Sequence, residues 1–200
     1  MANEQKILQA AEEVFADQGF AGATTSAIAH KAGLPKANIH YYFRTKEDLI
    51  HAVLENILTL WLDSADVIVA SADPAVAISR YIKSKIEYSR DRPNASKVFA
   101  SEILHGAPYL EKFLRTRLKE RVEQKSAVFK VWIEQGLMDP ISPEHLFFLI
   151  WSATQTYADF ETQVAAVLGR KSKPRPKDFD QAADFITRII LKGCGIRSRK

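Results

Sequence analysis

Apolar residues recur every three or four positions along most of this 200-residue chain, which is the period of an α-helix. In the first stretch, for example, Ile7, Ala11 and Phe15 would share one helical face with Leu8 and Val14. No segment shows a convincing alternation of apolar and polar residues, as a half-buried strand would. The sequence therefore predicts an all-α protein whose apolar helix faces are buried against one another.

Glycine, proline and capping residues divide this pattern into about nine helices. The expected helices are one that ends at Gly19, one from Thr24 or Thr25 to Gly33, a short one from about Pro35, a long one from Thr45 to about Ile68, one from Asp73 to Arg92, one over Val98–Leu104, one over Tyr109–Gln135, one from Ser142 to about Leu168, and a last one over Phe179–Lys192. Thr45 and Asp48 have the spacing of a capping box.

The composition is that of a globular chain, with 46% hydrophobic and 26% charged residues, and it excludes disorder as the main state. The single cysteine, Cys194, cannot form an internal disulfide, which fits a reducing compartment. The first residues lack an export signal, and the apolar run Leu146–Trp151 is too short to span a bilayer. We expect a cytoplasmic protein without a membrane partner.

The net charge of +4 is a weak indication of nucleic-acid binding, because it is unevenly distributed. Residues 169–200 have a charge of +7, whereas the rest of the chain has −3. The first fifty residues are themselves slightly acidic, at −1. A DNA-binding segment must therefore be identified by the placement of particular residues.

The segment Thr25–Phe43 reads TSAIAHKAGLPKANIHYYF and has the spacing of a helix-turn-helix. Ala29 is a small residue where two helices can touch, Gly33 suits a turn with positive φ, and Ile39 would lock the second helix onto the first. This spacing alone is also common in helical proteins that do not bind DNA.

The residues around this motif are suited to DNA contact, because they combine hydrogen-bond donors with helix N-termini. The predicted DNA-binding residues are Thr24, Thr25, Lys36, Asn38, His40, Tyr41, Tyr42 and Lys46. Among these, the alternative for Tyr42 is a core aromatic, and the alternative for His40 is an ordinary exposed histidine.

Two tryptophans and two polar residues are candidates for a small-molecule site. Trp61 and Trp151 offer flat faces to a planar ring, and Gln155, one turn after Trp151, offers both a donor and an acceptor. Lys85 lies on an apolar stripe and could donate to a ligand carbonyl. The structural alternatives are core tryptophans, a glutamine that satisfies a buried backbone group, and a lysine that extends to solvent.

Catalytic and metal-binding patterns are not found in the sequence. The five histidines lack metal-ligand spacing, and no phosphate-binding glycine loop or nucleophile elbow is present. Glu102 is a lone carboxylate without a partner for acid–base chemistry. We expect no metal, no cofactor and no enzymatic activity; the alternative class is an all-helical enzyme or ligand carrier.

Residues 19–54, GFAGATTSAIAHKAGLPKANIHYYFRTKEDLIHAVL, closely resemble the DNA-binding domain of TetR-family regulators. Two positions depart from that pattern: Ala37 replaces a frequent glycine, and Pro35 replaces the usual serine. The segments ILTLWL, EYSRDRPNAS, EILHGAPYL and WSATQTYADFETQVAAVLG resemble the RutR (YcdC-like) subgroup of that family, whose members sense pyrimidines.

The resemblance implies a helix-turn-helix DNA-binding domain over 1–46 and a ligand-binding and dimerisation domain over 47–200. It implies a homodimer joined through its last two long helices, a palindromic double-stranded operator, and ligand-lining roles for Trp61, Trp151 and Gln155. The expected function is that of a ligand-responsive transcriptional regulator, usually a repressor. The expected effector is a pyrimidine such as uracil or thymine; the alternatives are a dihydropyrimidine or an aromatic acid.

Overall fold

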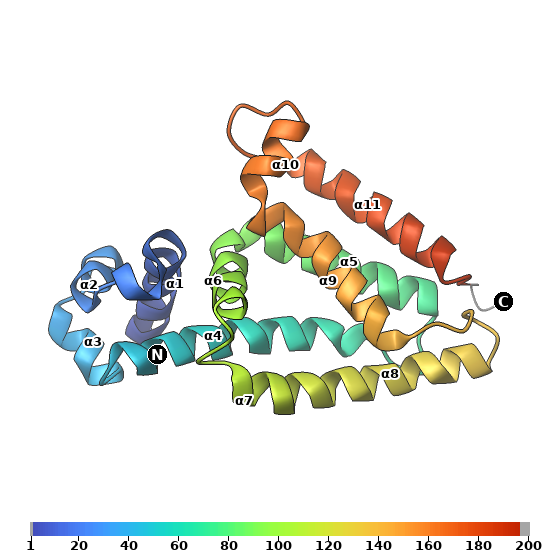
Figure 1. The fold of residues 1–200 in the computed structure, drawn as a ribbon, viewed down its shortest axis with the longest axis horizontal. Coiled ribbons are helices and arrows are strands. Elements are labelled where there is room, and N and C mark those ends of the chain that lie inside the picture. Colours follow the sequence, from blue (N-terminus) through green and yellow to red (C-terminus); the bar gives the residue numbers. More distant parts are fainter. Residues whose placement is uncertain (1, 197–200) are drawn as a thin grey trace. The chain divides into compact units, whose positions relative to one another are not determined.

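The structure is a computed structural model that describes residues 2–196, and these residues form helices and connections without any strand (Figure 1). The helices are α1 (Ala2–Gly22), α2 (Thr25–Ala32), α3 (Lys36–Tyr42), α4 (Lys46–Asp63), α5 (Pro74–Asp91), α6 (Pro93–Leu104), α7 (Glu111–Phe113), α8 (Lys119–Glu134), α9 (Pro143–Asp159), α10 (Glu161–Val167) and α11 (Pro176–Gly193). A 3₁₀ turn, η1 (Ser64–Val67), follows α4, and a π-helical turn, η2 (Leu114–Leu118), precedes α8. The all-α prediction is confirmed.

The predicted helix breaks are found, but several helix ends differ from the prediction. At Gly19 the backbone has φ 67° and ψ 172°, so α1 is interrupted there, and three helical residues follow. The helix expected from Ser142 to Leu168 is divided at Phe160, whose φ of −115° is not helical. The last helix begins at Pro176, because a proline in the first turn loses no hydrogen bond.

The described residues divide into two compact units. The first unit consists of residues 2–60 and 94–113, and the second unit consists of residues 61–93 and 114–196. The boundary lies inside α4, so the first turns of this helix pack with α1–α3 while its last turn belongs to the second unit. The sequence analysis predicted a DNA-binding domain over 1–46 and a ligand-binding and dimerisation domain over 47–200. That assignment of functions to domains stays a prediction.

In the first unit, apolar side chains from α1, α2, α3 and α4 form the core. The most deeply buried of them include Ile7, Ile28, Ile39, Leu49 and Leu54. The predicted capping box at the start of α4 is present: the Thr45 amide donates to Asp48 Oδ2 at 3.0 Å, and the Asp48 amide donates to Thr45 Oγ1 at 2.9 Å.

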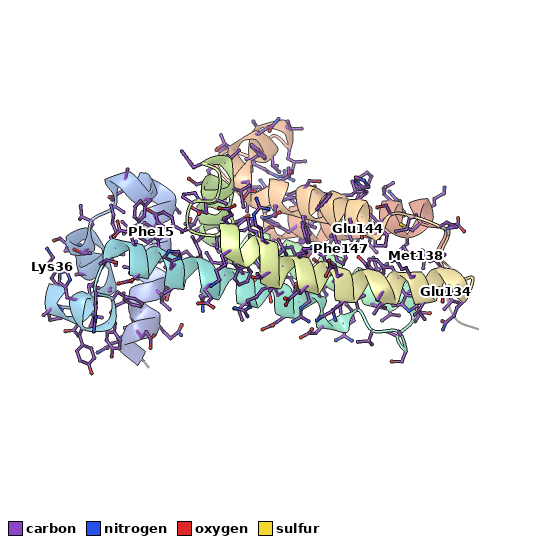
Figure 2. The ribbon with its side chains drawn as sticks, turned by 60° about the horizontal axis from the view of Figure 1, so that its bottom comes forward. Phe15, Lys36, Glu134, Met138, Glu144 and Phe147 are labelled. Carbon is purple, nitrogen blue, oxygen red and sulfur yellow. The ribbon has the colours of Figure 1, made fainter. Side chains whose placement is uncertain are left out.

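In the second unit, α5 packs against both α9 and α11, and α8 packs against α9 (Figure 1). Phe129 of α8 stacks on Phe147 of α9 with 5.4 Å between ring centroids, and Phe147 lies inside this unit (Figure 2). Ser89 Oγ of α5 donates to the Thr154 carbonyl of α9 at 2.9 Å. These contacts fix the register of α5 and α9, which hold the candidate ligand residues Lys85, Trp151 and Gln155.

The basic loop before α11 is tied to the helix that follows it. The Arg170 guanidinium lies 2.5 Å from Asp178, and the Arg175 amide donates to Asp178 Oδ2 at 2.7 Å. Arg170 and the backbone hydrogen bond lower the pKa of Asp178 to about 2. Part of the positive charge of the C-terminal region is thus neutralised. No helix in residues 2–196 has the length and apolar character needed to cross a membrane.

Candidate nucleic-acid and effector sites

The turn between α2 and α3 is built by the residues that the sequence pattern singled out. Thr24 Oγ1 accepts from the Ala27 amide at 3.1 Å and caps the start of α2. Gly33 has φ 66° and ψ 33°, a left-handed conformation that ends α2. Ala29 and Ile39 are both buried, so the two helices touch where the spacing predicted.

The exposed surface of α3 presents the predicted DNA-contacting side chains. Lys36, His40 and Tyr41 are exposed, and Lys36 points away from the helix (Figure 2). Asn38 and Tyr42 are half-buried, and the Tyr42 ring lies 5.1 Å from the Tyr41 ring in an edge-on contact. The surface therefore offers an ammonium, an imidazole, a phenol and part of an amide on one short helix.

Lys46 has a structural role that the sequence analysis missed. Its ammonium donates to the carbonyls of Phe20 at 2.7 Å and Ala23 at 3.1 Å, and it lies 4.4 Å from the centre of the Phe20 ring. These carbonyls lie at the end of α1, where a cation is favourable. The contact predicted between Lys46 and a DNA phosphate stays a prediction. Two of the three ammonium protons are donated to carbonyls, so this contact would use the third.

In the second unit, Lys85 is enclosed beside Trp61. The Lys85 ammonium lies 4.1 Å from the centre of the Trp61 ring, and the side chain is buried. Burial lowers the pKa of Lys85 to about 7, and the charge of Asp159 opposes this effect. The prediction that Lys85 could extend to solvent does not describe this structure, in which the ammonium faces an indole.

Trp151 lies on α9 next to Tyr81 of α5. Its indole N–H donates to the Tyr81 hydroxyl at 2.7 Å, so this N–H is already engaged. Burial raises the pKa of Tyr81 to about 12, although the hydrogen bond from Trp151 opposes the shift. The sequence analysis did not single out Tyr81 for this site; its place one helical turn before Lys85 was a signal that could have found it.

Gln155 follows Trp151 by one helical turn and is half-buried. Its side-chain amide forms no hydrogen bond with any residue from 2 to 196. Gln155 therefore does not satisfy a buried backbone group, which was the structural alternative for this residue. Five residues on α4, α5 and α9 form a series in which each side chain either contacts the next or lies one helical turn from it. In order they are Trp61, Lys85, Tyr81, Trp151 and Gln155.

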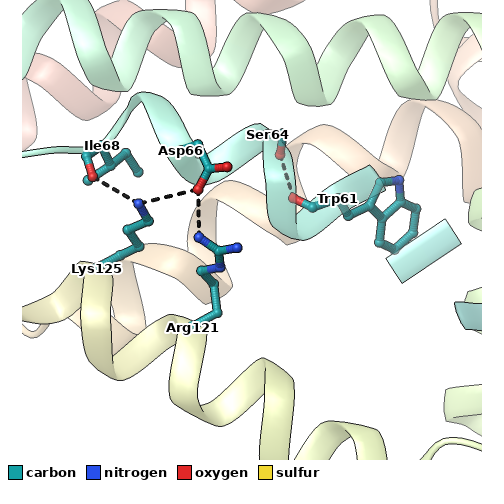
Figure 3. A network of polar contacts seen from close by, with 6 residues as sticks. All are labelled: Trp61, Ser64, Asp66, Ile68, Arg121 and Lys125. Atoms are coloured by element: carbon teal, nitrogen blue, oxygen red, sulfur yellow. Dashed lines mark hydrogen bonds and ion pairs between the residues drawn. The ribbon is translucent and has the colours of Figure 1, made fainter. Parts of the chain in front are cut away.

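A polar network ties η1 and the residue that follows it to α8 (Figure 3). Asp66 Oδ1 lies 2.6 Å from Arg121 and 3.6 Å from the Lys125 ammonium, and Lys125 also donates to the Ile68 carbonyl at 3.1 Å. Ser64 Oγ donates to the Trp61 carbonyl at 2.6 Å. The network holds the turn after Trp61 and so supports the position of that residue.

The described residues contain no group of three or more histidine, cysteine or acidic side chains that could hold a metal ion. Glu102, the lone carboxylate of the sequence analysis, is buried and accepts the backbone amides of Tyr109 at 2.5 Å and Leu110 at 3.1 Å. It therefore anchors the segment that leads into α7.

Comparison with known proteins places these two units in a known family. Residues 7–53 match bacterial regulatory proteins of the tetR family, and residues 54–197 match the C-terminal region of YcdC-like proteins. The chain belongs to the TetR family of transcriptional regulators, and within it to the proteins with a YcdC-like C-terminal region. The predicted family and the predicted helix-turn-helix are confirmed.

Two curated relatives are regulators of similar length. The chain is 42% identical over 192 residues to the transcriptional regulator RutR of Escherichia coli K12, covering 96% of this chain and 90% of RutR. It is 30% identical over 191 residues to the transcriptional repressor NicS of Pseudomonas putida, covering 94% and 90% of the two chains.

Solved structures share the fold. The TetR-family regulator PfmR of Thermus thermophilus superposes with a TM-score of 0.73 at 18% identity, covering 93% of this chain and 94% of PfmR. The Streptomyces coelicolor protein SCO4942 gives a TM-score of 0.72 at 23% identity over 96% and 98% of the two chains. The family members compared are transcriptional regulators, and the sequence of this chain is that of a DNA-binding regulator.

Proposed function

We propose that this chain is a homodimeric repressor whose α3 helices read the two halves of a palindromic operator in the major groove. Lys36, His40 and Tyr41 are exposed on a short helix fixed by buried Ala29 and Ile39, which is the arrangement a recognition helix requires. Phosphate contacts from Lys36 and Lys46 supply affinity, and Asn38 contributes to base reading.

The effector is a small planar heterocycle, and a pyrimidine such as uracil or thymine fits the groups present. The observation that supports this most directly is the unpartnered amide of Gln155 one helical turn after Trp151, in the unit where the buried Lys85 lies over Trp61. An amide can pair with the N–H and carbonyl on one edge of a pyrimidine, and the ammonium can donate to a second carbonyl. The indole faces of Trp61 and Trp151 suit the ring.

The direct test of DNA binding is a gel shift with the DNA that flanks the protein's own gene, with and without added uracil or thymine. We expect a retarded complex that the pyrimidine weakens. Absence of any retardation at low salt would instead favour the helical ligand carrier or enzyme.

The effector class is tested by thermal unfolding with uracil, thymine, dihydrouracil and benzoate. A true effector at about 100 times its dissociation constant stabilises the folded protein by about 2.7 kcal/mol. Gln155→Ala removes the edge-pairing amide and should abolish that shift, whereas Gln124→Ala on the exposed surface of α8 should keep it. A shift with benzoate or dihydrouracil alone would reject the pyrimidine and select that alternative.

The proposal of a homodimer is supported by apolar side chains that are exposed on α9 and α11. Phe148 and Leu149 of α9 are each 54% exposed, and Phe185 and Ile189 of α11 are 55% and 51% exposed. Large apolar side chains exposed on two helices that contact each other favour an interaction site, and a two-fold dimer would cover the same side chains on both copies.

A further inference from the structure

The first unit contains a cavity that the proposed function does not use. It has a volume of about 330 Å³ and is bounded by α1, α4, α6 and the segment between α6 and α7. Ile50 and Val98 contribute apolar side chains, and Phe20, Glu102, His105 and Tyr109 contribute rings and polar atoms. All of these residues belong to the same compact unit as the helix-turn-helix.

Glu102 contributes a buried carboxylate to this cavity, with only 8% of the residue exposed. Its Oε1 accepts two backbone amides, those of Tyr109 and Leu110. Its Oε2 takes no part in these two hydrogen bonds, and it is not among the enclosed side-chain atoms without a partner, so it is accessible from the cavity. A carboxylate oxygen that is accessible from an otherwise largely apolar cavity can accept a charge-assisted hydrogen bond from a cationic group that enters it.

The other polar atoms favour the same kind of ligand. His105 Nδ1 lies 2.7 Å from the Ser101 carbonyl, so Nδ1 holds a proton and donates to that oxygen, and only Nε2 of the ring remains for a ligand. Burial is the main cause that raises the pKa of Tyr109, and the nearby charges of Glu47 and Glu102 act in the same direction. Donors on a ligand would therefore meet acceptors in the cavity.

Aromatic rings surround the same space. The Phe20 and Tyr109 rings lie 4.9 Å apart, and His51 contacts Tyr109 edge-on at 5.2 Å. The nearby Lys46 ammonium is held by two carbonyls and does not line the cavity. Aromatic faces stabilise organic cations and also accommodate an apolar ligand body.

We propose that this cavity is a second small-molecule site, and that it binds an organic ammonium ion with a small aromatic body. The ammonium contacts Glu102 Oε2, and the ring lies against Phe20 and Tyr109. The volume is at the small end of ligand sites, which limits the ligand to about the size of 2-phenylethylammonium.

The test is isothermal titration calorimetry of the full chain with 2-phenylethylammonium, with neutral 2-phenylethanol and with anionic 3-phenylpropionate. We expect saturable binding of the ammonium ion, and affinities at least about tenfold weaker for the other two, because only the cation pairs with Glu102. Equal binding of the alcohol, or no binding of the ammonium ion at millimolar concentration, would overturn the proposal.

The site is located with Glu102→Gln and the control Glu120→Gln. The glutamine oxygen can still accept the Tyr109 and Leu110 amides, so the variant loses the charge and keeps the anchor of α7. Glu120 is exposed on α8 and gives the same change in net charge. We expect about tenfold weaker ammonium binding for Glu102→Gln alone. Unchanged binding would place the ligand elsewhere, and the ligand series on the unmodified chain remains decisive if the variant fails to fold.

Discussion

Lys85 combines a titratable ammonium with nearly complete burial, and this makes folding stability depend on pH. Its pKa falls from 10.5 in the unfolded chain to about 7 in the folded chain. Between these values the unfolded chain binds one more proton, so stability rises with pH, at most by about 1.4 kcal/mol per pH unit. We expect Lys85→Met to remove this rise and to stabilise the protein near pH 7 by about 1–3 kcal/mol.

Urea unfolding followed by circular dichroism, at about pH 7 and about pH 8.5, measures both effects. Lys83→Met is the matched control, because Lys83 is exposed on the same helix. The control should keep the pH dependence of the original chain. If Lys85→Met and the original chain gain equal stability between the two pH values, Lys85 is charged in the folded protein and the proposed environment is wrong.

Lys36 and Asn38 should affect DNA binding in different ways. Lys36→Ala removes a phosphate contact from each protomer, so affinity should fall by a similar factor on all sequences and the salt slope should decrease by about 0.9 per lost contact. Asn38→Ala removes a base-reading amide and should change the preference among operator variants by about 1–3 kcal/mol. Fluorescence anisotropy over a salt series measures both, with Lys83→Ala as the control. A lost sequence preference in Lys36→Ala would contradict these roles.

Among the helical elements, α2 depends on a backbone conformation at its end. Gly33 has φ +66°, and no heavy atom beyond its two chain neighbours lies within 4 Å of the position that a Cβ would take, so a side chain there meets backbone strain and not a clash. Gly33→Ala should therefore destabilise the protein by about 1 kcal/mol, and Gly33→Asn should cost less because asparagine tolerates this conformation.

Gly22→Ala provides the matched control for this element. Its Cβ would lie 3.5 Å from Gln18 Cβ, an ordinary contact, in the last residue of α1. We expect a neutral or slightly stabilising effect, because alanine favours a helix. The measurement is the urea concentration at the unfolding midpoint of Gly33→Ala, Gly33→Asn and Gly22→Ala. A Gly33→Ala midpoint that matches Gly22→Ala would show that α2 does not depend on the left-handed turn.

For the whole molecule, the proposed dimer buries Phe185 and Ile189 of α11 together with Phe148 and Leu149 of α9. Phe185→Glu should weaken self-association at least about tenfold, since burying a carboxylate in an apolar interface is costly. Val76→Glu is the control, because Val76 is 56% exposed on α5. Sedimentation velocity over a concentration series measures the change. A dimer that tolerates Phe185→Glu but not Val76→Glu would place the interface elsewhere.

The loss of the dimer should also reduce operator binding. Two recognition helices on one dimer bind two half-sites together, so each protomer raises the effective concentration of the other. A monomeric Phe185→Glu protein keeps its helix-turn-helix and should bind a single half-site as the original chain does. This outcome distinguishes a lost interface from a misfolded DNA-binding unit.

Much of the architecture could be predicted from the sequence, because the information is local. Thr24, Gly33 and the Thr45–Asp48 pair act on backbone groups within a few residues, so their capping and turn roles follow from identity and spacing alone. Helical periodicity likewise predicted the buried faces. The last helix was expected to begin at Phe179 and begins at Pro176, where the signals are also local: a proline in the first turn, and an Asp178 carboxylate that accepts from the Arg175 amide at 2.7 Å.

The sequence by itself determined the all-helical fold, the helix-turn-helix and the exposed donors of α3. Tertiary structure decided which partners the polar side chains meet: Lys46 on the carbonyls at the end of α1, Trp151 on Tyr81, and Lys85 over Trp61. It also decided that Glu102 and the rings of Phe20 and Tyr109 meet around one cavity. The physical reason is that helix formation depends on neighbours in the chain, whereas burial and pairing depend on residues that only folding brings together.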